Sequence, residues 1–509
     1  MIEQQVALKT AAGLAAAQRV YTEGGFSKSF ARLNLTAPLS TAVTSGTSIN
    51  GVSATGPAVM GKALGDFAMG SSTIDVQYLN GGCYVGGLPS ANVTTDNCLT
   101  ESGSVTIATA NGSAVAVVYN YVALVANNNG RTIQGFSTSA DTKMLSCPIG
   151  CPYPDFKKFY DYYRVADYGD QWVTASFAGT ATTFTRGNAD FSNGRGNLID
   201  LRVGKCVKTK RQCIKREKVV CWLISFFSFQ QETIQKGTAY LIVWMYVLRE
   251  FEDALDDCQD GCINCNDDPV HAWDEGVAFY TGSSHGTMAG TTDPGYFIYS
   301  LANKRCANFK TCGTTGDAIT GNSKVNYDLF ALFDTGRTQL QNGQCAAARI
   351  TKNKVAQLMA VPATQGTLRY AYITGAQGTS TPKAIGEGAV FAAAVLPLVH
   401  ACSPTDALLI YNNMQVNRAA TDFAAVKAAF ERNYECMGFT CQDVGGYYNK
   451  DASAYFNGAT PCTDEPVSSI AGYMPGSQVT DHVSAVYAVW SFSKRELSLT
   501  PDIGPLECH

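Results

Sequence analysis

The residues best suited to chemistry lie between positions 250 and 275, where carboxylates concentrate around one histidine. Glu250, Asp253 and Asp257 are spaced i, i+3 and i+7, so they share one face of a helix. His271 and Glu275 follow at a spacing of i, i+4 and can share one ligand position. Oxygen ligands with one imidazole suit a hard or borderline cation such as iron. The spacing therefore predicts an iron site built from these five side chains.

The same residues have a second interpretation. Acidic side chains at the C-terminal end of a helix oppose the helix dipole, at a cost of about 0.3–1 kcal/mol, and a bound cation would offset that cost. The alternative is an ordinary solvated helix end beside a disulfide-pinned turn. Cys258, Cys262 and Cys265 lie in that turn with the spacing C-x3-C-x2-C and no close histidine, which is a poor match to a zinc site.

Two helices must position this site. Residues 234–257 contain no proline and are dense in apolar side chains, which predicts one long helix. Asp268 and Pro269 then predict the N-cap and first residue of a second helix. A five-residue motif in this second helix, EGVAF at 275–279, recurs as EGAVF at 387–391. If the repeat is genuine, it indicates two related helical units, with Glu387 as a further metal-ligand candidate.

Composition and patterning predict a mainly α fold of helical hairpins, pinned by disulfides and joined by Gly/Thr-rich loops. The chain is 46% hydrophobic and 16% charged, so it can bury a large core. We expect a helix near Val59–Phe67 and a buried apolar helix over Ala389–Val399. The longest apolar runs fall short of the roughly 18 residues of a membrane span, so none is expected.

One segment, residues 205–230, does not match its surroundings. It carries seven Lys/Arg and one Glu in a chain of net charge −4. Its ends are compatible with splice signals, so we interpret it as a translated, unspliced intron; the alternative is a basic surface loop. The segment separates an N-terminal helical/loop unit, 1–200, from a helical region, 231–509, that can be divided into 231–345 and 346–509. Outside it there is no basic patch, which argues against a nucleic-acid partner.

The 18 cysteines, many closely spaced, indicate an oxidising compartment. Spacing favours local pairs, although it does not determine connectivity. The opening residues lack the regions of a signal peptide, so we expect a leader to be missing from this sequence. The local pairs expected are Cys83 with Cys98, Cys147 with Cys151, Cys306 with Cys312, and Cys436 with Cys441; three glycosylation sequons begin at Asn34, Asn92 and Asn111.

Four long segments carry a family resemblance. They are REFEDALDDC (249–258), NCNDDPVHAWDEGVAFYTGS (264–283), QGTLRYAY (365–372) and GEGAVFAAAVLPLVHAC (386–402). The chain resembles, over nearly its whole length except 205–230, the low-iron-inducible periplasmic proteins of algae, also described as iron-assimilation or high-CO2-inducible periplasmic proteins. The resemblance implies secretion to the periplasmic space or cell surface and a role in iron uptake, with a surface iron transporter or ferroxidase as partner.

The sequence offers few signals for other functions. The sequence contains no H-E-x-x-H or Walker-type motif, and the E-x-x-H pairs of di-iron bundles are missing, so we do not expect an enzyme. The main alternative is a structural or adhesive cell-surface glycoprotein, induced by iron or CO2 status, that binds calcium at most.

Overall fold

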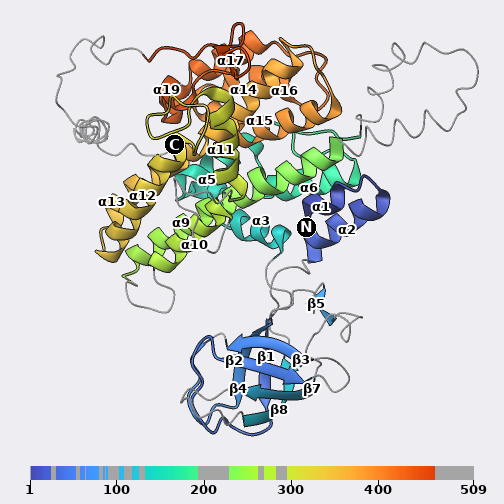
Figure 1. The fold of residues 1–509 in the computed structure, drawn as a ribbon, viewed down its shortest axis with the longest axis vertical. Coiled ribbons are helices and arrows are strands. Elements are labelled where there is room, and N and C mark those ends of the chain that lie inside the picture. Colours follow the sequence, from blue (N-terminus) through green and yellow to red (C-terminus); the bar gives the residue numbers. More distant parts are fainter. Residues whose placement is uncertain are drawn as a thin grey trace, which may run out of the picture. The chain divides into compact units, whose positions relative to one another are not determined.

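The computed structural model confirms a mainly α protein and adds a small closed β-barrel (Figure 1). Residues Met1–Cys462 form one compact unit and Thr463–His509 a second, of which little is described. The structure describes residues 2–23, 30–52, 58–63, 65–78, 84–85, 88–89, 102–107, 117–124, 132–192, 229–261, 269–282 and 295–464.

In the chain, two helices precede the barrel strands and the other described helices follow them. Those of the N-terminal part are α1 (Ile2–Val6), α2 (Ala11–Glu23), α3 (Ile133–Asp141), α4 (Cys147–Gly150), α5 (Pro154–Tyr163) and α6 (Tyr168–Ala178). Helical residues 229–237 then lead into the π-helix η2 (Thr238–Val243), α9 (Trp244–Gln259), α10 (Pro269–Thr281), α11 (Phe297–Phe309), α12 (Lys324–Gln341), α13 (Cys345–Met359), α14 (Val361–Thr374), α15 (Pro382–Cys402), α16 (Pro404–Met414), α17 (Phe423–Glu431), α18 (Tyr434–Met437) and α19 (Cys441–Val444).

Six antiparallel strands close the barrel in the order β1-β4-β3-β2-β7-β8. Along each strand the side chains alternate between the inside and the outside of the barrel. On β1, Leu33 and Leu35 point inward and are buried, whereas Arg32 is exposed and pairs with Asp75. The strands are β1 (Phe30–Leu35), β2 (Ser48–Val52), β3 (Ala58–Ala63), β4 (Thr73–Tyr78), β7 (Ser102–Ile107) and β8 (Val117–Leu124); two short pairs, β5 (Tyr84–Val85) with β6 (Leu88–Pro89) and β9 (Tyr448–Asn449) with β10 (Ala454–Tyr455), lie outside it.

The helix predicted near Val59–Phe67 is wrong, because β3 occupies the start of that segment. Gly61 and Gly65 weaken its helix propensity, and pairing with β2 and β4 satisfies the backbone of β3 instead. Of the three sequons, Asn34 lies half-buried on β1 opposite Val122 of β8. Asn92 and Asn111 lie outside the described residues.

The predicted helical hairpins are present, and the repeated Glu-Gly motif lies in the second helix of two of them. In the α9–α10 hairpin, a Cβ on Gly276 would approach the Phe251 ring to 2.6 Å. In the α14–α15 hairpin, a Cβ on Gly388 would lie 3.0 Å from the Tyr370 Cβ. Both glycines therefore let two helices pack closely, which gives the recurrence a packing role.

Helices from both sides of residues 205–230 share one hydrophobic core. The Tyr163 hydroxyl of α5 donates to the Ala393 carbonyl of α15 at 2.7 Å. Most of the predicted insert, 205–228, lies outside the described residues. Its last two residues, Phe229 and Gln230, are buried in a helix, where the Gln230 amide donates to the Ser176 carbonyl at 2.9 Å.

Helix α15 confirms the buried apolar helix expected over Ala389–Val399. Among the helices that the structure describes, it alone has the length and hydropathy to cross a membrane, yet 72% of the relevant window is buried against the rest of the protein. The composition of α15 therefore fits the core helix of a folded protein as well as it fits a membrane-spanning helix.

Five disulfides lie in the described part of the chain, as expected for an oxidising compartment. The local pairs Cys147–Cys151 and Cys306–Cys312 are confirmed. The predicted Cys436–Cys441 pair is wrong: α18 packs against α15, which brings Cys436 to Cys402, and Cys441 pairs with Cys462. Cys258, predicted to bond within its turn, instead joins the end of α9 to Cys345 at the start of α13. The predicted candidates Cys83, Cys98, Cys262 and Cys265 lie outside the described residues.

Candidate functional site

Helices α9 and α10 pack side by side and bring together three of the predicted metal ligands (Figure 1). His271 and Glu275 lie on α10 with 3.4 Å between imidazole Nε2 and carboxylate Oε1, and the His271 side chain is 63% exposed. Glu250 of α9 is buried. Burial raises its pKa, and the nearby charge of Glu275 adds to that rise, against the effects of Tyr246 and Arg249. Pro269 is the first residue of α10, as predicted.

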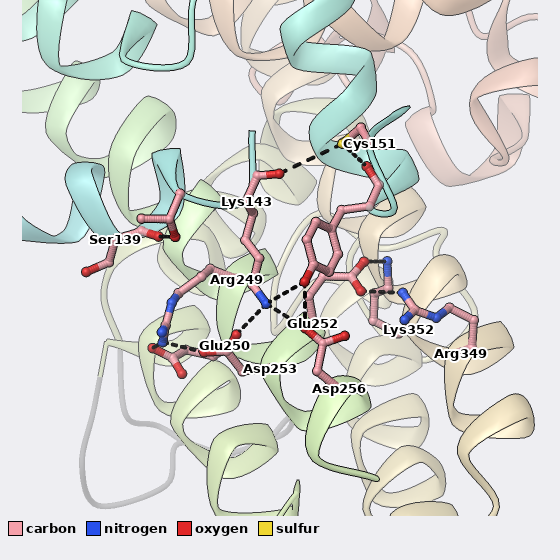
Figure 2. Close-up of polar contacts among 12 residues, drawn as sticks. Ser139, Lys143, Cys151, Arg249, Glu250, Glu252, Asp253, Asp256, Arg349 and Lys352 are labelled. Carbon is pink, nitrogen blue, oxygen red and sulfur yellow. Dashed lines mark hydrogen bonds and ion pairs between the residues drawn. The ribbon is translucent and has the colours of Figure 1, made fainter. Parts of the chain in front are cut away.

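Asp253, by contrast, is already neutralised by two cations. The Lys143 ammonium of the loop after α3 lies 2.6 Å from one of its oxygens, and the Arg249 guanidinium lies 2.6 Å from the other (Figure 2). Lys143 also reaches Asp256 at 2.7 Å, and the Tyr153 hydroxyl donates to Asp256 at 2.8 Å. Burial lowers the pKa of Lys143, but its hydrogen bonds to the two aspartates outweigh that effect and raise it. Asp253 therefore does not need a metal to balance its charge.

A second group of ion pairs continues inward from this face of α9. Glu252 is fully buried and accepts from both Lys352 and Arg349 of α13 (Figure 2). The Lys352 ammonium also donates to Asp155 of α5 at 2.8 Å. Burial alone would raise the pKa of Asp155, but Lys352 and Lys158 lower it to about 2. We call the combined set the matched-charge network: Lys143, Asp155, Arg249, Glu252, Asp253, Asp256, Arg349 and Lys352.

Glu387 belongs to a different site, because α15 pairs with α14 and not with the α9–α10 hairpin. Its carboxylate lies beside Glu232, which the helix preceding η2 supplies. The Lys236 ammonium lies 3.4 Å from a Glu232 oxygen and 3.5 Å from a Glu387 oxygen. Burial, and the charge of Glu232 after it, raise the pKa of Glu387 to about 7. The prediction that Glu387 joins the other five ligands finds no support in this placement.

Three more polar side chains complete this second site. Arg305 of α11 has its pKa lowered to about 10, first by burial and then by the positive charge of Arg369 on α14. Tyr240 lies in the π-helix, an element often found at functional sites. The charge of Glu387 acts on both Arg305 and Tyr240. We call the set the interior polar cluster: Glu232, Lys236, Tyr240, Arg305, Arg369 and Glu387.

Several buried atoms of the interior polar cluster make no hydrogen bond with any residue that the structure describes. These atoms are Oε2 of Glu232, Oε2 of Glu387, Nε and Nη1 of Arg305, and Nε of Arg369. The two glutamates are 4% and 6% exposed, respectively. Unsatisfied buried polar atoms on this scale are uncommon in folded proteins and call for an explanation.

Sequence reasoning missed most of this cluster. Glu232, Lys236 and Tyr240 are spaced i, i+4, i+8, a signal of one shared helix face that was available in the sequence. Nothing in the spacing of Arg305 and Arg369 shows that α11 and α14 bring them to that face.

Neither cluster is a ready-made multi-carboxylate metal centre. Within the ranges that the structure describes, no three His, Cys, Asp or Glu side chains are placed to hold one metal ion. Residues 262–268, next to the predicted site, are outside those ranges. Comparison with protein-family models, with curated proteins and with solved structures finds no match to this chain.

Proposed function

We propose that this chain is a secreted protein of iron assimilation that binds iron at the paired ends of α9 and α10. The observation that carries the proposal is the His271–Glu275 pair of one imidazole and one carboxylate, with Glu250 close enough for the charge of Glu275 to act on it. Within the described ranges no third side chain is placed to complete a site with this pair, so iron binding requires Glu250 to move towards it. Such a donor set suits iron. Because His271 and Glu275 reach solvent, iron has access to them from outside.

The ligand set proposed here is smaller than the one expected from spacing. Asp253 is excluded because Lys143 and Arg249 hold both of its oxygens. Glu387 is excluded because it lies in the interior polar cluster. Asp257, half-buried in the last turn of α9, stays a candidate as a fourth ligand.

The disulfides support the secreted part of the proposal, since they are consistent with an extracellular or periplasmic location. The resemblance to algal iron-assimilation proteins supports the cargo and suggests a surface transporter or ferroxidase as partner. We propose glycosylation at Asn34, Asn92 and Asn111 on the sequons alone.

A second candidate function is a structural or adhesive surface glycoprotein that binds calcium at most. One observation favours it: most of the acidic face of α9 already pairs with lysine and arginine. On this alternative, the acidic residues stabilise the packing of helices and have no metal to bind.

Equilibrium dialysis of the secreted protein against iron, with calcium and zinc as competitors, separates the two candidates. We expect the wild-type protein to retain iron and the double variant His271→Ala/Glu275→Gln to lose it. The matched control is Asp334→Asn, which removes an exposed carboxylate of α12. Binding should weaken as pH falls, because protons compete for imidazole and carboxylate. Equal iron retention by the double variant and wild type would refute the site, and selective calcium retention would favour the second candidate.

A further inference from the structure

The interior polar cluster has more positive charge than negative charge. Lys236, Arg305 and Arg369 bring three cations, whereas Glu232 and Glu387 bring two carboxylates. Lys236 lies between the two carboxylates and is paired with both. Neither arginine makes an ion pair with any residue that the structure describes, and Arg369 instead lies over the Tyr370 ring, 4.9 Å from its centre.

The unsatisfied atoms of the cluster are of both kinds. Arg305 and Arg369 present buried N–H donors without an acceptor. Oε2 of Glu387 accepts no hydrogen bond from any residue that the structure describes, and Oε2 of Glu232 meets the Lys236 ammonium at 3.4 Å without a well-aligned hydrogen bond. Each such group destabilises the folded protein when it stays unsatisfied. A molecule that satisfied them would need an acceptor group for the arginines and a donor group for the glutamates.

The cluster also has access to solvent. Lys236 keeps 18% of its side chain exposed, and Tyr240, Arg305 and Arg369 are half-buried. The cluster therefore lies near the protein surface and is not sealed deep in the core.

From these observations we propose that the interior polar cluster binds a small hydroxycarboxylic acid. The carboxylate accepts from Arg305 and Arg369, whose planar guanidinium groups match carboxylate geometry. The hydroxyl donates to Oε2 of Glu387, the oxygen that Lys236 does not reach. The ligand's net negative charge compensates the excess positive charge, which an amino acid without net charge would not do. A metal ion at this position would increase the same excess.

This site is independent of the iron site proposed above. Its residues come from residues 229–243, α11, α14 and α15, and it shares none with α9 or α10. The test therefore uses the full-length protein stripped of metal.

The experiment is a calorimetric titration with malate as the probe and chloride at matched ionic strength as the reference. We expect malate to bind, and succinate, which lacks the hydroxyl, to bind about three- to tenfold more weakly for the loss of one hydrogen bond. Arg305→Met should abolish binding, and Arg305→Lys, which keeps the charge and loses the planar fork, should weaken it. Arg337→Met is the matched control, because Arg337 is exposed on α12.

Two outcomes would overturn the proposal. One is malate heat no larger than that of chloride; the other is unchanged malate binding in Arg305→Met and Arg369→Met proteins that keep a wild-type circular dichroism spectrum. Loss of iron binding with malate binding intact would refute only the proposed function, and the reverse result would refute only this inference.

Discussion

The matched-charge network and the interior polar cluster are both built where helices pack, yet they treat charge differently. In the network, each carboxylate lies within ion-pair distance of a lysine or arginine, and Lys352 serves two of them. In the cluster, the two arginines have no ion-pair partner and five buried atoms have no hydrogen bond within the part of the chain that the structure describes. A high density of acidic residues in the sequence therefore does not mark a ligand site by itself. Buried charge that the protein leaves unmatched is the more informative sign.

The strongest test of the network is the substitution Lys352→Met. Lys352 is fully buried between Asp155 and Glu252, so its loss leaves uncompensated carboxylates in the core. We expect the free energy of unfolding to fall by about 3–5 kcal/mol, measured by urea denaturation with disulfides intact. The matched control is Lys354→Met, since Lys354 is exposed on the same helix. A loss no larger than in the control would show that the network is not a stabilising unit.

The interior polar cluster should respond to pH, through Glu387. Its pKa is raised from the ordinary value of 4.5 to about 7, so the folded state binds its proton more tightly than the unfolded state does. The stabilisation from that proton is complete below pH 4.5 and is lost as pH rises towards 7. The variant Glu387→Gln should thus match wild type at low pH and exceed it by about 3 kcal/mol above pH 7.

Urea denaturation at several pH values measures this difference. Glu431→Gln, which removes a half-buried carboxylate paired with Lys427 on α17, controls for the loss of one negative charge. If the stability difference between Glu387→Gln and wild type stays constant from pH 4.5 to pH 7, the pKa of Glu387 is not raised by burial beside Glu232.

Two arginine substitutions should have opposite effects. Arg349→Met removes one partner of the buried Glu252 and should destabilise the protein by about 1–3 kcal/mol. Arg305→Met replaces a half-buried cation that has no ion-pair partner among the described residues with an apolar side chain, so we expect it to be neutral or to stabilise the ligand-free protein by about 1 kcal/mol. Both are read from urea midpoints in metal-free buffer. Destabilisation of equal size would remove the distinction between the two regions.

The smallest stability effect is expected at the proposed iron site. The His271 side chain is 63% exposed, so His271→Ala should change the unfolding free energy by less than about 0.5 kcal/mol in the absence of metal. Thermal unfolding with and without iron measures this. With iron bound, wild type should gain stability that the variant does not. A large loss without metal would indicate a structural role for His271.

Several features of this fold followed from local sequence. The proline-free apolar run before 257, Pro269 at a helix start and the buried helix over Ala389–Val399 all depend on spacing within one element. The two confirmed disulfides close short loops, so proximity along the chain was enough.

The features that sequence did not yield depend on contacts between distant segments. The spacing of the acidic residues predicted that Asp253 lies on one face of α9. It could not predict that Lys143, in a loop 110 residues earlier in the chain, neutralises Asp253. The barrel was missed because glycines interrupt the alternating pattern of β2 and β3, so that closure, not propensity, defines those strands. Arg305 and Arg369 meet only through the packing of α11 on α14.

Hydrogen–deuterium exchange followed by mass spectrometry tests the contrast between the two regions most directly. The metal-free protein is compared with protein plus iron and with protein plus malate. Iron should slow exchange in α9 and α10, and malate should slow it in α11, α14 and α15. Protection of α11, α14 and α15 by iron, or of neither region by either ligand, would contradict the assignment of one ligand to each region.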